Sequence, residues 1–349
     1  MVIGPKKTAL LAAPDSLPRL SRNHLQMSSN QQGAKFSPAP GLAEFYAGLA
    51  KAESELLPGG RPHITEVRRI AEAARKTWTK GGPVMHRVAD TTVETPHGAV
   101  RVRVFYPNDA ENKPVLVYLH GGGWTIFSLE THDRIMREYA ARANVAVVGV
   151  DYSLSPEAKF PVALEQSVAV IRWLRENGNS LGLDHTRLSV GGDSAGGNLS
   201  IAAGLMLRDQ GFSSMLRAMV LNYSVFDRDF TRPSYQRFGG GDMILNIDEM
   251  KGFWDNYLPD AKAKENPYAV PVLADLRGLP PCFMAITEAD VLHDENVEMA
   301  LRLQAAGVPV KSVVYEGTAH SFLEAVSIAD VSRKALADGS HWLSDILRR

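Results

Sequence analysis

The sequence has a single cysteine, almost no net charge and no long apolar run, and each of these absences excludes a class of protein. With one cysteine in 349 residues, Cys282, the chain can form neither an intramolecular disulfide nor a zinc site built on cysteines. Its formal charge of -1 gives no electrostatic attraction to nucleic acid or to an anionic membrane. No stretch approaches the ~18 consecutive apolar residues of a membrane span.

Two motifs that would point to other classes are also missing. The N-terminal stretch MVIGPKKTALLAAPDS has two lysines before an apolar run of five residues, which is shorter than the ~7–15 residues of a secretory signal. No G-x-G-x-x-G follows a predicted strand, so a dinucleotide cofactor is not indicated. We therefore expect a soluble, cytoplasmic protein without cofactor or metal, with no nucleic-acid partner and no stable membrane insertion.

What the chain does contain is a globular composition, with 45% apolar and 22% charged residues. A chain of 349 residues can bury a large core and form one large domain or two ordinary ones. Residues 1–40 are rich in Ser, Gln, Asn and Pro and show little periodicity. We expect about the first two dozen of them to be poorly ordered.

The first periodic segments predict two helices and a hairpin. Apolar residues recur at helical spacing over Leu42–Leu57 and Ile64–Trp78. The stretches HRVADTTVET and GAVRVRVFYP then alternate with a period of two around the turn PHG, which is typical of an antiparallel hairpin. We assign residues 1–84 to an N-terminal segment with cap helices and residues 85–349 to the main domain.

From residue 114 onward, short apolar runs alternate with helical stretches. The runs lack clean alternation, as expected of strands buried on both faces. The expected strands are PVLVYL, VAVVGV, RLSV, AMVLNY, CFMAI and KSVVYEG, and Cys282 begins the fifth of them as a core residue. The expected helices are Glu130–Arg142, Pro161–Glu176, Ala195–Arg208 and Asn296–Ala306. This order predicts an α/β fold with a mostly parallel, doubly wound central sheet flanked by helices.

A long interval between MVLNYSV and PPCFMAI interrupts this order. The interval is rich in Phe, Tyr and Trp, and is too aromatic for a linker. We expect residues 226–272 to form a helical cap together with the N-terminal helices. The cap would cover the carboxyl edge of the sheet, where α/β proteins bind ligands.

The stretch LSVGGDSAGGNLS surrounds Ser194 with glycines, between a predicted strand and an alanine-rich helix. G-x-S-x-G in this setting is typical of a nucleophile elbow, in which a tight turn holds a serine hydroxyl where it can react. The first N–H groups of the helix that starts at Ala195 point at the same place and can hold a developing oxyanion. The alternative interpretation is a flexible loop with an inert serine.

A nucleophilic serine needs a base and an orienting acid, which follow it in this type of sheet in the order acid, then histidine. Three histidines follow Ser194 in the chain. His341 falls in a C-terminal helical pattern, and His293 is expected to open a helix beside the candidate acids. His320 follows the last predicted strand, in YEGTAHSF, and is the predicted base.

The acid is expected in the loop after the penultimate strand, CFMAITEADVLHDEN. Asp294 is more simply explained as a cap or first-turn acid of the next helix, and Glu288 follows the strand very closely. Asp290 is the predicted acid. Asp227, after the preceding strand, is the alternative.

A second glycine-rich loop, LHGGGW, directly follows the predicted strand PVLVYL. Three consecutive glycines let backbone N–H groups point into a cavity, as in the oxyanion loops of lipases and esterases. The simpler alternative is an ordinary glycine-rich strand exit. We expect His120 to orient this loop, since it precedes the serine and is not in the position of the base.

Together these segments resemble the bacterial hormone-sensitive lipase-like esterases (family IV) of the α/β-hydrolase fold. The resemblance extends from about residue 85 to the C-terminus and rests on HGGGW, DYSLSPEAKFP, GDSAGGNL, LADLRGLPP, EADVLHDE and AHSF. It implies a catalytic triad of Ser194, Asp290 and His320. The oxyanion hole that it implies consists of the N–H groups of Gly122, Gly123 and Ala195.

Three positions depart from the pattern of that family. It usually has Arg where Ser153 stands, an aromatic or Gly-Tyr-like residue near Ala289, and Gly where Ser321 follows the histidine. None of these departures removes a catalytic group. They bear on substrate preference and on the rigidity of the loops.

The expected activity is hydrolysis of short to medium acyl esters through an acyl-enzyme intermediate. Trp124 is the predicted substrate-binding residue beside the acyl path, and the helix with Phe45 and Tyr46 is expected to close the pocket from above. The alternatives are a lactonase or amidase on the same triad and a non-catalytic receptor for a small molecule. The last strand, KSVVYEG, is an expected sheet edge through which a homodimer could form.

Overall fold

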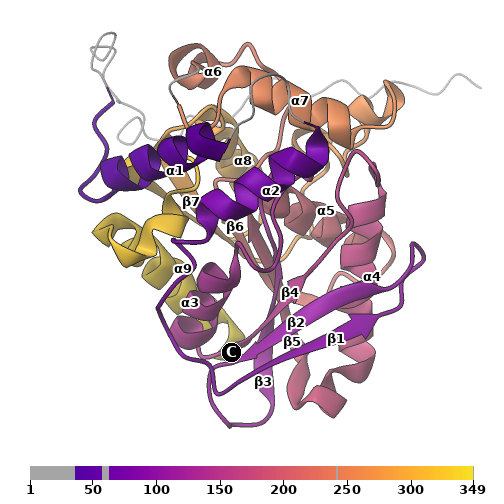
Figure 1. Cartoon of the computed structure of the whole chain (residues 1–349). Coiled ribbons are helices and arrows are strands. Elements are labelled where there is room, and N and C mark those ends of the chain that lie inside the picture. The colour runs from indigo at the N-terminus through magenta and orange to yellow at the C-terminus, as the bar shows by residue number, and fades with distance from the viewer. Residues whose placement is uncertain (1–35, 57–62, 241–242, 349) are drawn as a thin grey trace, which may run out of the picture. The chain divides into compact units, whose positions relative to one another are not determined.

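One sheet of eight strands organises the protein (Figure 1). The computed structural model describes residues 36–56, 63–240 and 243–348, and everything from Ser37 onward belongs to one unit. The expected disorder near the N-terminus and the end of the first predicted helix at Leu57 lie outside the described residues. The strands, in chain order, are β1 (Arg87–Val93), β2 (Val100–Tyr106), β3 (Lys113–Leu119), β4 (Ala146–Val150), β5 (Leu183–Asp193), β6 (Leu216–Asn222), β7 (Cys282–Ala289) and β8 (Val310–Ala319).

The strands lie in the order β1-β2-β4-β3-β5-β6-β7-β8. β1 pairs antiparallel with β2, which pairs antiparallel with β4, so the predicted hairpin is confirmed. From β4 to β8 all neighbours are parallel. The predicted α/β class with a mostly parallel central sheet is therefore confirmed, and the last predicted strand, β8, is indeed an edge.

The order of the strands brings the two glycine-rich loops together. After β3 the chain moves to β4 on one side, whereas after β5 it moves to β6 on the other side. Between β3 and β5 the direction of winding reverses, and a crevice opens at the carboxyl ends of two such strands. The segments that leave β3 and β5 there are the loop with Gly122 and the turn with Ser194.

Alternate residues of each strand point to opposite faces of the sheet, and each face buries its own apolar layer. Leu188 and Val190 of β5 lie in one layer, while Leu116 and Tyr118 of β3 lie in the other. Helices that contribute to the first layer are α4 (Val162–Asn177), α5 (Ala195–Asp209) and α8 (His293–Ala305). Those of the second layer are α1 (Leu42–Leu56), α3 (Asp133–Ala143) and α9 (Asp330–Arg348).

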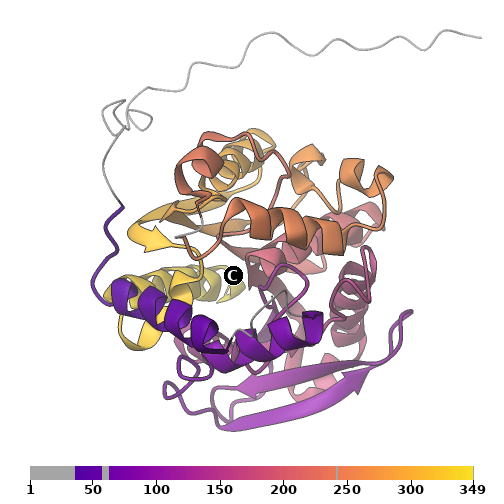
Figure 2. The ribbon, with the colours of Figure 1, turned by 45° about the horizontal axis from the view of Figure 1, so that its top comes forward.

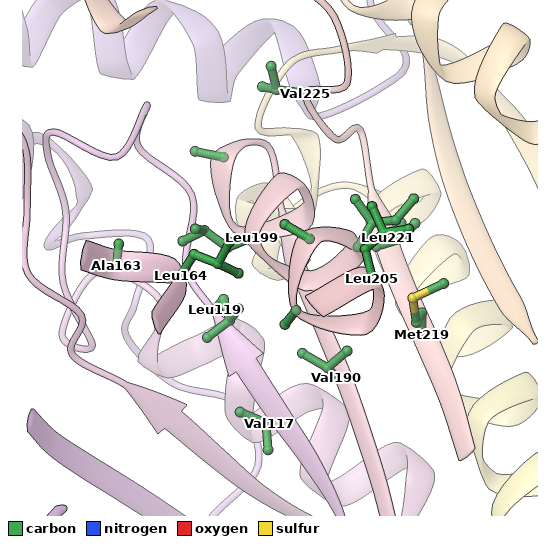
Figure 3. Close-up of a cluster of buried hydrophobic side chains, with 14 of the residues drawn as sticks. Val117, Leu119, Ala163, Leu164, Val190, Leu199, Leu205, Met219, Leu221 and Val225 are labelled. Carbon is green, nitrogen blue, oxygen red and sulfur yellow. The ribbon is translucent and has the colours of Figure 1, made fainter. Parts of the chain in front are cut away.

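Figure 3 shows the first layer where it supports the elbow helix. Leu119, Val190 and Leu221 come from three neighbouring strands and surround Leu199 and Leu205 of α5. All five are almost completely buried, and burying each such side chain is worth about 1.5–3 kcal/mol. α5 is therefore held rigidly against the sheet, and so is the serine at its N-terminus.

The predicted helices are present, with ends that differ by a few residues. α3 begins at Asp133, three residues after the predicted start, because Ser128–Thr131 form a turn in which Thr131 Oγ1 accepts from the Ser128 N–H at 3.1 Å. α8 begins at His293, as expected of that residue, and α2 (Ile64–Arg75) ends before Trp78. Such ends depend on capping contacts that a periodic pattern does not contain.

In the part of the aromatic interval that the structure describes, α6 (Pro233–Phe238) and α7 (Ile247–Tyr257) are short α-helices. α7 begins with a capping box: the Asn246 side chain accepts from the Glu249 N–H, and the Glu249 carboxylate accepts from the Asn246 N–H. Figure 2 shows the indigo helices α1 and α2 and, across from them, the orange helix α7 at the same end of the sheet, where residues of all three line one cavity.

Candidate active site

Ser194 lies in a strained turn between β5 and α5. Its backbone has φ 52° and ψ −119°, and its side chain makes no capping hydrogen bond to the helix. A Cβ atom on Gly192 would come within 2.2 Å of the Leu119 carbonyl oxygen, and one on Gly196 within 1.9 Å. The turn therefore requires glycine on both sides, and the hydroxyl of Ser194 is left free for another partner.

That partner is His320, which follows β8. Its Nε2 lies 3.0 Å from Ser194 Oγ, and its Nδ1 lies 2.7 Å from Asp290 Oδ2. Because the carboxylate accepts from Nδ1–H, the neutral ring has Nε2 unprotonated and able to accept the serine proton. The three predicted residues, which are up to 126 positions apart, are thus brought into one hydrogen-bonded chain.

Asp290 is held in place by its own contacts after β7. Its Oδ2 accepts from the Thr287 hydroxyl at 2.8 Å, and its Oδ1 accepts from the Leu292 N–H at 3.0 Å. Burial raises the pKa of this carboxyl group, but the His320 ring and these hydrogen bonds outweigh burial and lower the pKa below its ordinary value. Asp290 therefore stays ionised beside the imidazole.

The pKa of His320 shifts in the opposite direction. Burial acts to lower it, but the negative charge of Asp290 and its hydrogen bond raise it more, and Asp193 and Glu324 add to the rise. The net result is a pKa above the ordinary 6.5. The His320 ring therefore holds a proton more firmly than a free imidazole does.

The other candidate acids are engaged elsewhere. Asp294 Oδ2 accepts from the Ser234 N–H at 2.7 Å, and Glu288 Oε2 accepts from the Gly317 N–H at 2.6 Å. Asp227 pairs with Arg232. Of the carboxylates considered from the sequence, only Asp290 lies beside His320.

The remaining histidines after Ser194 also lie away from it. The His293 ring at the start of α8 binds the Thr287 carbonyl oxygen through Nδ1 at 2.6 Å. His341 is exposed on α9.

His120 orients the loop that follows β3. Its Nδ1 lies 2.7 Å from the Gly121 carbonyl oxygen, and its ring stacks on Tyr152, whose hydroxyl donates to the His120 carbonyl oxygen at 2.7 Å. In a planar trans peptide, the C=O of residue 121 and the N–H of residue 122 point in opposite directions. Fixing the Gly121 carbonyl on His120 therefore turns the Gly122 N–H the other way. Burial, with His132 nearby, lowers the pKa of His120 to about 3, so the ring is neutral.

The backbone of this loop needs glycine. Gly122 has φ 108° and Gly123 has φ 57°, and a Cβ on Gly123 would overlap the Phe253 ring at 2.2 Å. Among the described residues, no acceptor takes the N–H groups of Gly122, Gly123 or Ala195. These three donors are available to a ligand next to Ser194, and the Ala195 N–H opens α5, where the helix dipole adds a partial positive charge.

A second carboxylate–histidine pair lies beneath the elbow. Asp193 Oδ2 lies 3.2 Å from His132 Nε2, and Asp193 Oδ1 accepts from the Tyr118 hydroxyl at 2.8 Å; all three side chains are buried. Burial acts against the charge of both groups, but their mutual attraction lowers the pKa of Asp193 and raises that of His132. A Cβ on Gly121 would come within 2.4 Å of Asp193 Oδ2. The pair therefore packs directly against the oxyanion loop.

Sequence reasoning missed this pair. Asp193 is inside the G-x-S-x-G motif, and its position next to Ser194 was the available signal. His132 lies 61 positions away, in a stretch that carries no motif.

A cavity of about 80 Å³ borders Ser194 and His320. The oxyanion loop contributes Gly122, Gly123 and Trp124 to its lining, and the region around α7 contributes Leu245, Glu249, Met250 and Phe253. Trp124, the predicted substrate contact, lies here, with its buried ring stacked on Tyr257 at a centroid distance of 4.1 Å.

The helix with Phe45 and Tyr46, α1, reaches the cavity as expected, through Glu53. Its aromatic residues lie elsewhere: Phe45 lies in the second core layer, and Tyr46 both donates to the Ala319 carbonyl oxygen (3.0 Å) and accepts from the Ala319 N–H (2.8 Å). Glu53 and Arg75 face the cavity instead, and Tyr46 ties α1 to the backbone next to His320.

Of the three departures from the family's pattern, Ser321 alone has an unusual backbone. Ser153 is bound to Gln166 through its N–H (2.8 Å) and its hydroxyl oxygen (2.9 Å), and Ala289 is buried at the end of β7. Ser321 has φ 64° and lines the cavity. A left-handed backbone at this position explains why glycine is usual there.

Metal ligation and membrane crossing both need features that the described part of the chain lacks. In residues 36–56, 63–240 and 243–348, no group of three or more His, Cys, Asp or Glu side chains is placed to hold a metal ion. Within the same ranges no helix has the length and apolar character that crossing a bilayer requires.

Comparison with known proteins identifies the family. A model of the α/β-hydrolase fold family matches residues 116–324, more than half of the chain. An acetyl esterase of Salmonella choleraesuis (strain SC-B67) is 34% identical over 270 residues, which are 77% of this chain and 83% of that protein.

Solved structures agree with this assignment. A hyperthermophilic esterase from the archaeon Pyrobaculum calidifontis has a TM-score of 0.83 at 33% identity, over 87% of this chain and 97% of its own. A thermostable carboxylesterase cloned from a metagenomic library has a TM-score of 0.80 at 33% identity, over 82% and 99%. The chain therefore belongs to the α/β-hydrolase fold family and, within it, to the hormone-sensitive lipase-like family IV of serine carboxylesterases.

Proposed function

We propose that this serine carboxylesterase cleaves carboxylic esters with short to medium acyl chains by nucleophilic attack of Ser194. The observation that carries the proposal is the continuous chain of hydrogen bonds from Asp290 through His320 to Ser194 Oγ. A serine in this arrangement can lose its proton to the ring as it attacks, and the resulting imidazolium is stabilised by the carboxylate.

The proposed reaction has two halves. His320 Nε2 takes the Ser194 proton while Oγ bonds to the ester carbonyl carbon, and the N–H groups of Gly122, Gly123 and Ala195 bind the oxyanion. His320 then gives the proton to the leaving oxygen as the carbon–oxygen bond breaks, which leaves an acyl-enzyme and a free alcohol. Water repeats the same steps on the acyl-enzyme and releases the carboxylic acid.

The size of the cavity supports a short acyl chain. A volume of about 80 Å³ holds only a handful of water-sized groups. Trp124, Met250 and Phe253 give it apolar walls, which suit a hydrocarbon chain until the space is full.

We also propose that residues 1–84 and 226–272 act as a cap on a catalytic domain of residues 85–349. Glu53 and Arg75 of the first segment and Met250 and Phe253 of the second line the same cavity as Ser194, which supports this division. A cytoplasmic location and a homodimer stay predictions from the sequence. The position of β8 at the edge of the sheet is compatible with a dimer.

The test is hydrolysis of p-nitrophenyl esters with acyl chains from acetate to palmitate, by the wild type and by Ser194→Ala and His320→Ala. We expect turnover of the short esters and a loss of several orders of magnitude in kcat for each variant, with circular dichroism unchanged. Because the triad acts as a unit, the double variant should be little worse than either single one. Retention of more than a few per cent of activity by either variant would contradict the proposal.

The alternatives use the same site or no chemistry at all. A lactonase or an amidase needs the same triad, and a panel of lactones and amides beside the esters would reveal it by a higher kcat/KM. A non-catalytic receptor would bind esters without turnover. The intact hydrogen-bonded chain to Ser194 favours catalysis over that role.

A further inference from the structure

The cavity wall formed by α1 and α2 carries charged side chains that have no role in the proposed ester cleavage itself. Arg75 is buried in that wall, and its Nη1 donates to Glu53 Oε1 at 2.9 Å. Its Nε lies 3.4 Å from Glu324 Oε2, and its guanidinium stacks over the Phe127 ring at 4.2 Å. One cation is thus shared by two carboxylates.

A third carboxylate reaches the cavity from α7. Glu249 lines it with an exposed side chain, and its Oε2 accepts from the Asn246 N–H at 3.0 Å. Among the described residues, no cationic group lies within ion-pair distance of Glu249. The pKa of Glu249 is raised overall, because partial burial and the negative charge of Glu53 act in that direction, although the side chain reaches solvent. The Asn246 N–H, His320 and Arg75 oppose the rise. Glu249, Glu53 and Arg75 therefore act on one another across the cavity.

The balance of charge on this side of the cavity is negative. Glu53 and Glu249 in the lining, and Glu324 outside it beside Arg75, are three carboxylates for one guanidinium, so their formal charges sum to −2. The other acidic group in the lining, Asp193, is paired with the buried ring of His132. Charges interact more strongly across a small and partly enclosed cavity than across bulk water, because the effective dielectric constant is lower.

The leaving alcohol is the part of the ester that would meet this charge. His320 must protonate the leaving oxygen, so the alcohol departs on the side of the imidazole. Directly after His320, Ser321 lines the cavity and Glu324 lies in a short 3-10 helix (Phe322–Ser327) against Arg75. The charged side chains therefore lie on the His320 side of the cavity, whereas Trp124 and Phe253 lie on the side of the loop that follows β3.

We propose that the cavity selects esters whose alcohol part carries a positively charged ammonium group and discriminates against esters whose alcohol part carries a carboxylate. This inference rests on the proposed ester hydrolysis and adds the chemical class of the alcohol. Glu53 and Glu249 are the specificity-determining residues, because they are the carboxylates of the wall that also line the cavity.

The experiment compares butyrylcholine with 3,3-dimethylbutyl butyrate, which has nearly the same shape but a carbon in place of the cationic nitrogen. The 3-butyryloxypropanoate anion completes the series. At low ionic strength we expect kcat/KM to be roughly tenfold higher for the cation than for the neutral ester, and lower again for the anion. The ratio of cation to neutral ester should fall toward one in high salt, because screening weakens the attraction.

Two variants assign the effect to the wall. Glu53→Gln and Glu249→Gln should each lower the ratio about three- to tenfold. Glutamine at position 249 can still accept from the Asn246 N–H, so the start of α7 is kept. Matched controls are Glu55→Gln on α1, an exposed carboxylate near Lys51, and Asp248→Asn on α7; neither residue lines the cavity, and neither change should alter the ratio beyond twofold or so.

The outcomes separate this inference from the proposed function. If neither butyrylcholine nor the neutral ester is hydrolysed, or if Ser194→Ala still hydrolyses them, the ester-hydrolase proposal is overturned and the charge selection with it. If the neutral ester is hydrolysed but the ratio in the wild type is one or less, only the charge selection is overturned. If Glu53→Gln and Glu55→Gln lowered this ratio equally, the charge selection would also be overturned. The preference would then come from the overall surface charge and not from the residues that line the cavity.

Discussion

Asp290 and Asp294 are four residues apart but make different contacts, so we expect them to have different roles. Asp290 touches His320 Nδ1, whereas Asp294 binds the backbone of α6 through Ser234. We expect Asp290→Asn to lower kcat by about 10³–10⁴, because the amide favours the wrong imidazole tautomer. Asp294→Asn should change kcat by only a few fold. Steady-state kinetics of the two purified variants measures this difference. A large loss of kcat in Asp294→Asn would mean that the acid has been misassigned.

The pH dependence of the enzyme follows from the raised pKa of His320. The base acts in its neutral form, so kcat/KM should fall as the pH drops through a value above 6.5. At pH 5 we expect at least about a tenfold loss relative to pH 8. A pH–rate profile on a substrate that does not itself ionise measures this. A flat profile between these values would exclude a histidine base with a raised pKa.

At the scale of single residues, the sequence predicted the proposed triad but not its surroundings. Ser194, Asp290 and His320 could be predicted because each follows a strand of a parallel sheet, and such strands end at one edge. Nothing in the sequence connects Asp193 with His132, or Arg75 with Glu324, because these pairs form only when distant segments pack together.

At the scale of elements, the elbow depends on the absence of a side chain at Gly196. A methyl group there would meet the Leu119 carbonyl oxygen at 1.9 Å, so Gly196→Ala should lower the free energy of unfolding by about 3 kcal/mol or more, and activity with it. A methyl group on Gly252 in α7 would meet no other atom within 4 Å. Gly252→Ala should therefore raise the free energy of unfolding by about 0.5–1 kcal/mol. Urea unfolding of both variants tests the contrast, which similar values would refute.

The oxyanion loop is an element held by one side chain. His120→Phe keeps an aromatic ring against Tyr152 but removes the bond to the Gly121 carbonyl oxygen, which fixes the Gly122 N–H. We expect kcat to fall about tenfold or more while KM changes little, because the oxyanion forms only in the transition state. A purely structural role for His120 would instead lower the melting temperature and leave kcat of the folded enzyme unchanged.

Elements were easier to predict than their orientation. The periodicity of residues 42–56 gave α1 correctly, but it did not tell which side of the helix faces the core and which faces the cavity. The helix was expected to border the pocket, and it does so through the charged Glu53, whereas Phe45 is buried in the core and Tyr46 is bound to Ala319. An apolar residue gains most from full burial, and a carboxylate keeps more of its hydration beside an open cavity.

At the scale of the whole molecule, the cavity joins parts that are far apart in the chain. Loops after β3, β5 and β8 supply the reactive groups, while α1, α2 and α7 supply the remaining walls. The mostly parallel sheet could be expected from the alternation of strands and helices, but the order of its strands, with the reversal between β3 and β5, could not. The size and charge of the cavity could not be expected either, because they depend on how the helices at residues 42–56, 64–75 and 247–257 pack over the sheet.

The preference for acyl chain length is a property of this whole assembly. Each methylene that fits an apolar slot contributes about 0.8 kcal/mol, until the slot is full and further groups collide with its walls. The cavity is small, and Trp124 is fixed in its lining by stacking on Tyr257. We therefore expect kcat/KM to rise from acetate to about butyrate or hexanoate esters and then to fall. Trp124→Ala, or Met250→Ala if the first variant is too unstable, should move the optimum to longer chains. Faster turnover of palmitate than of butyrate esters by the wild type would show that the acyl chain leaves the cavity by another path.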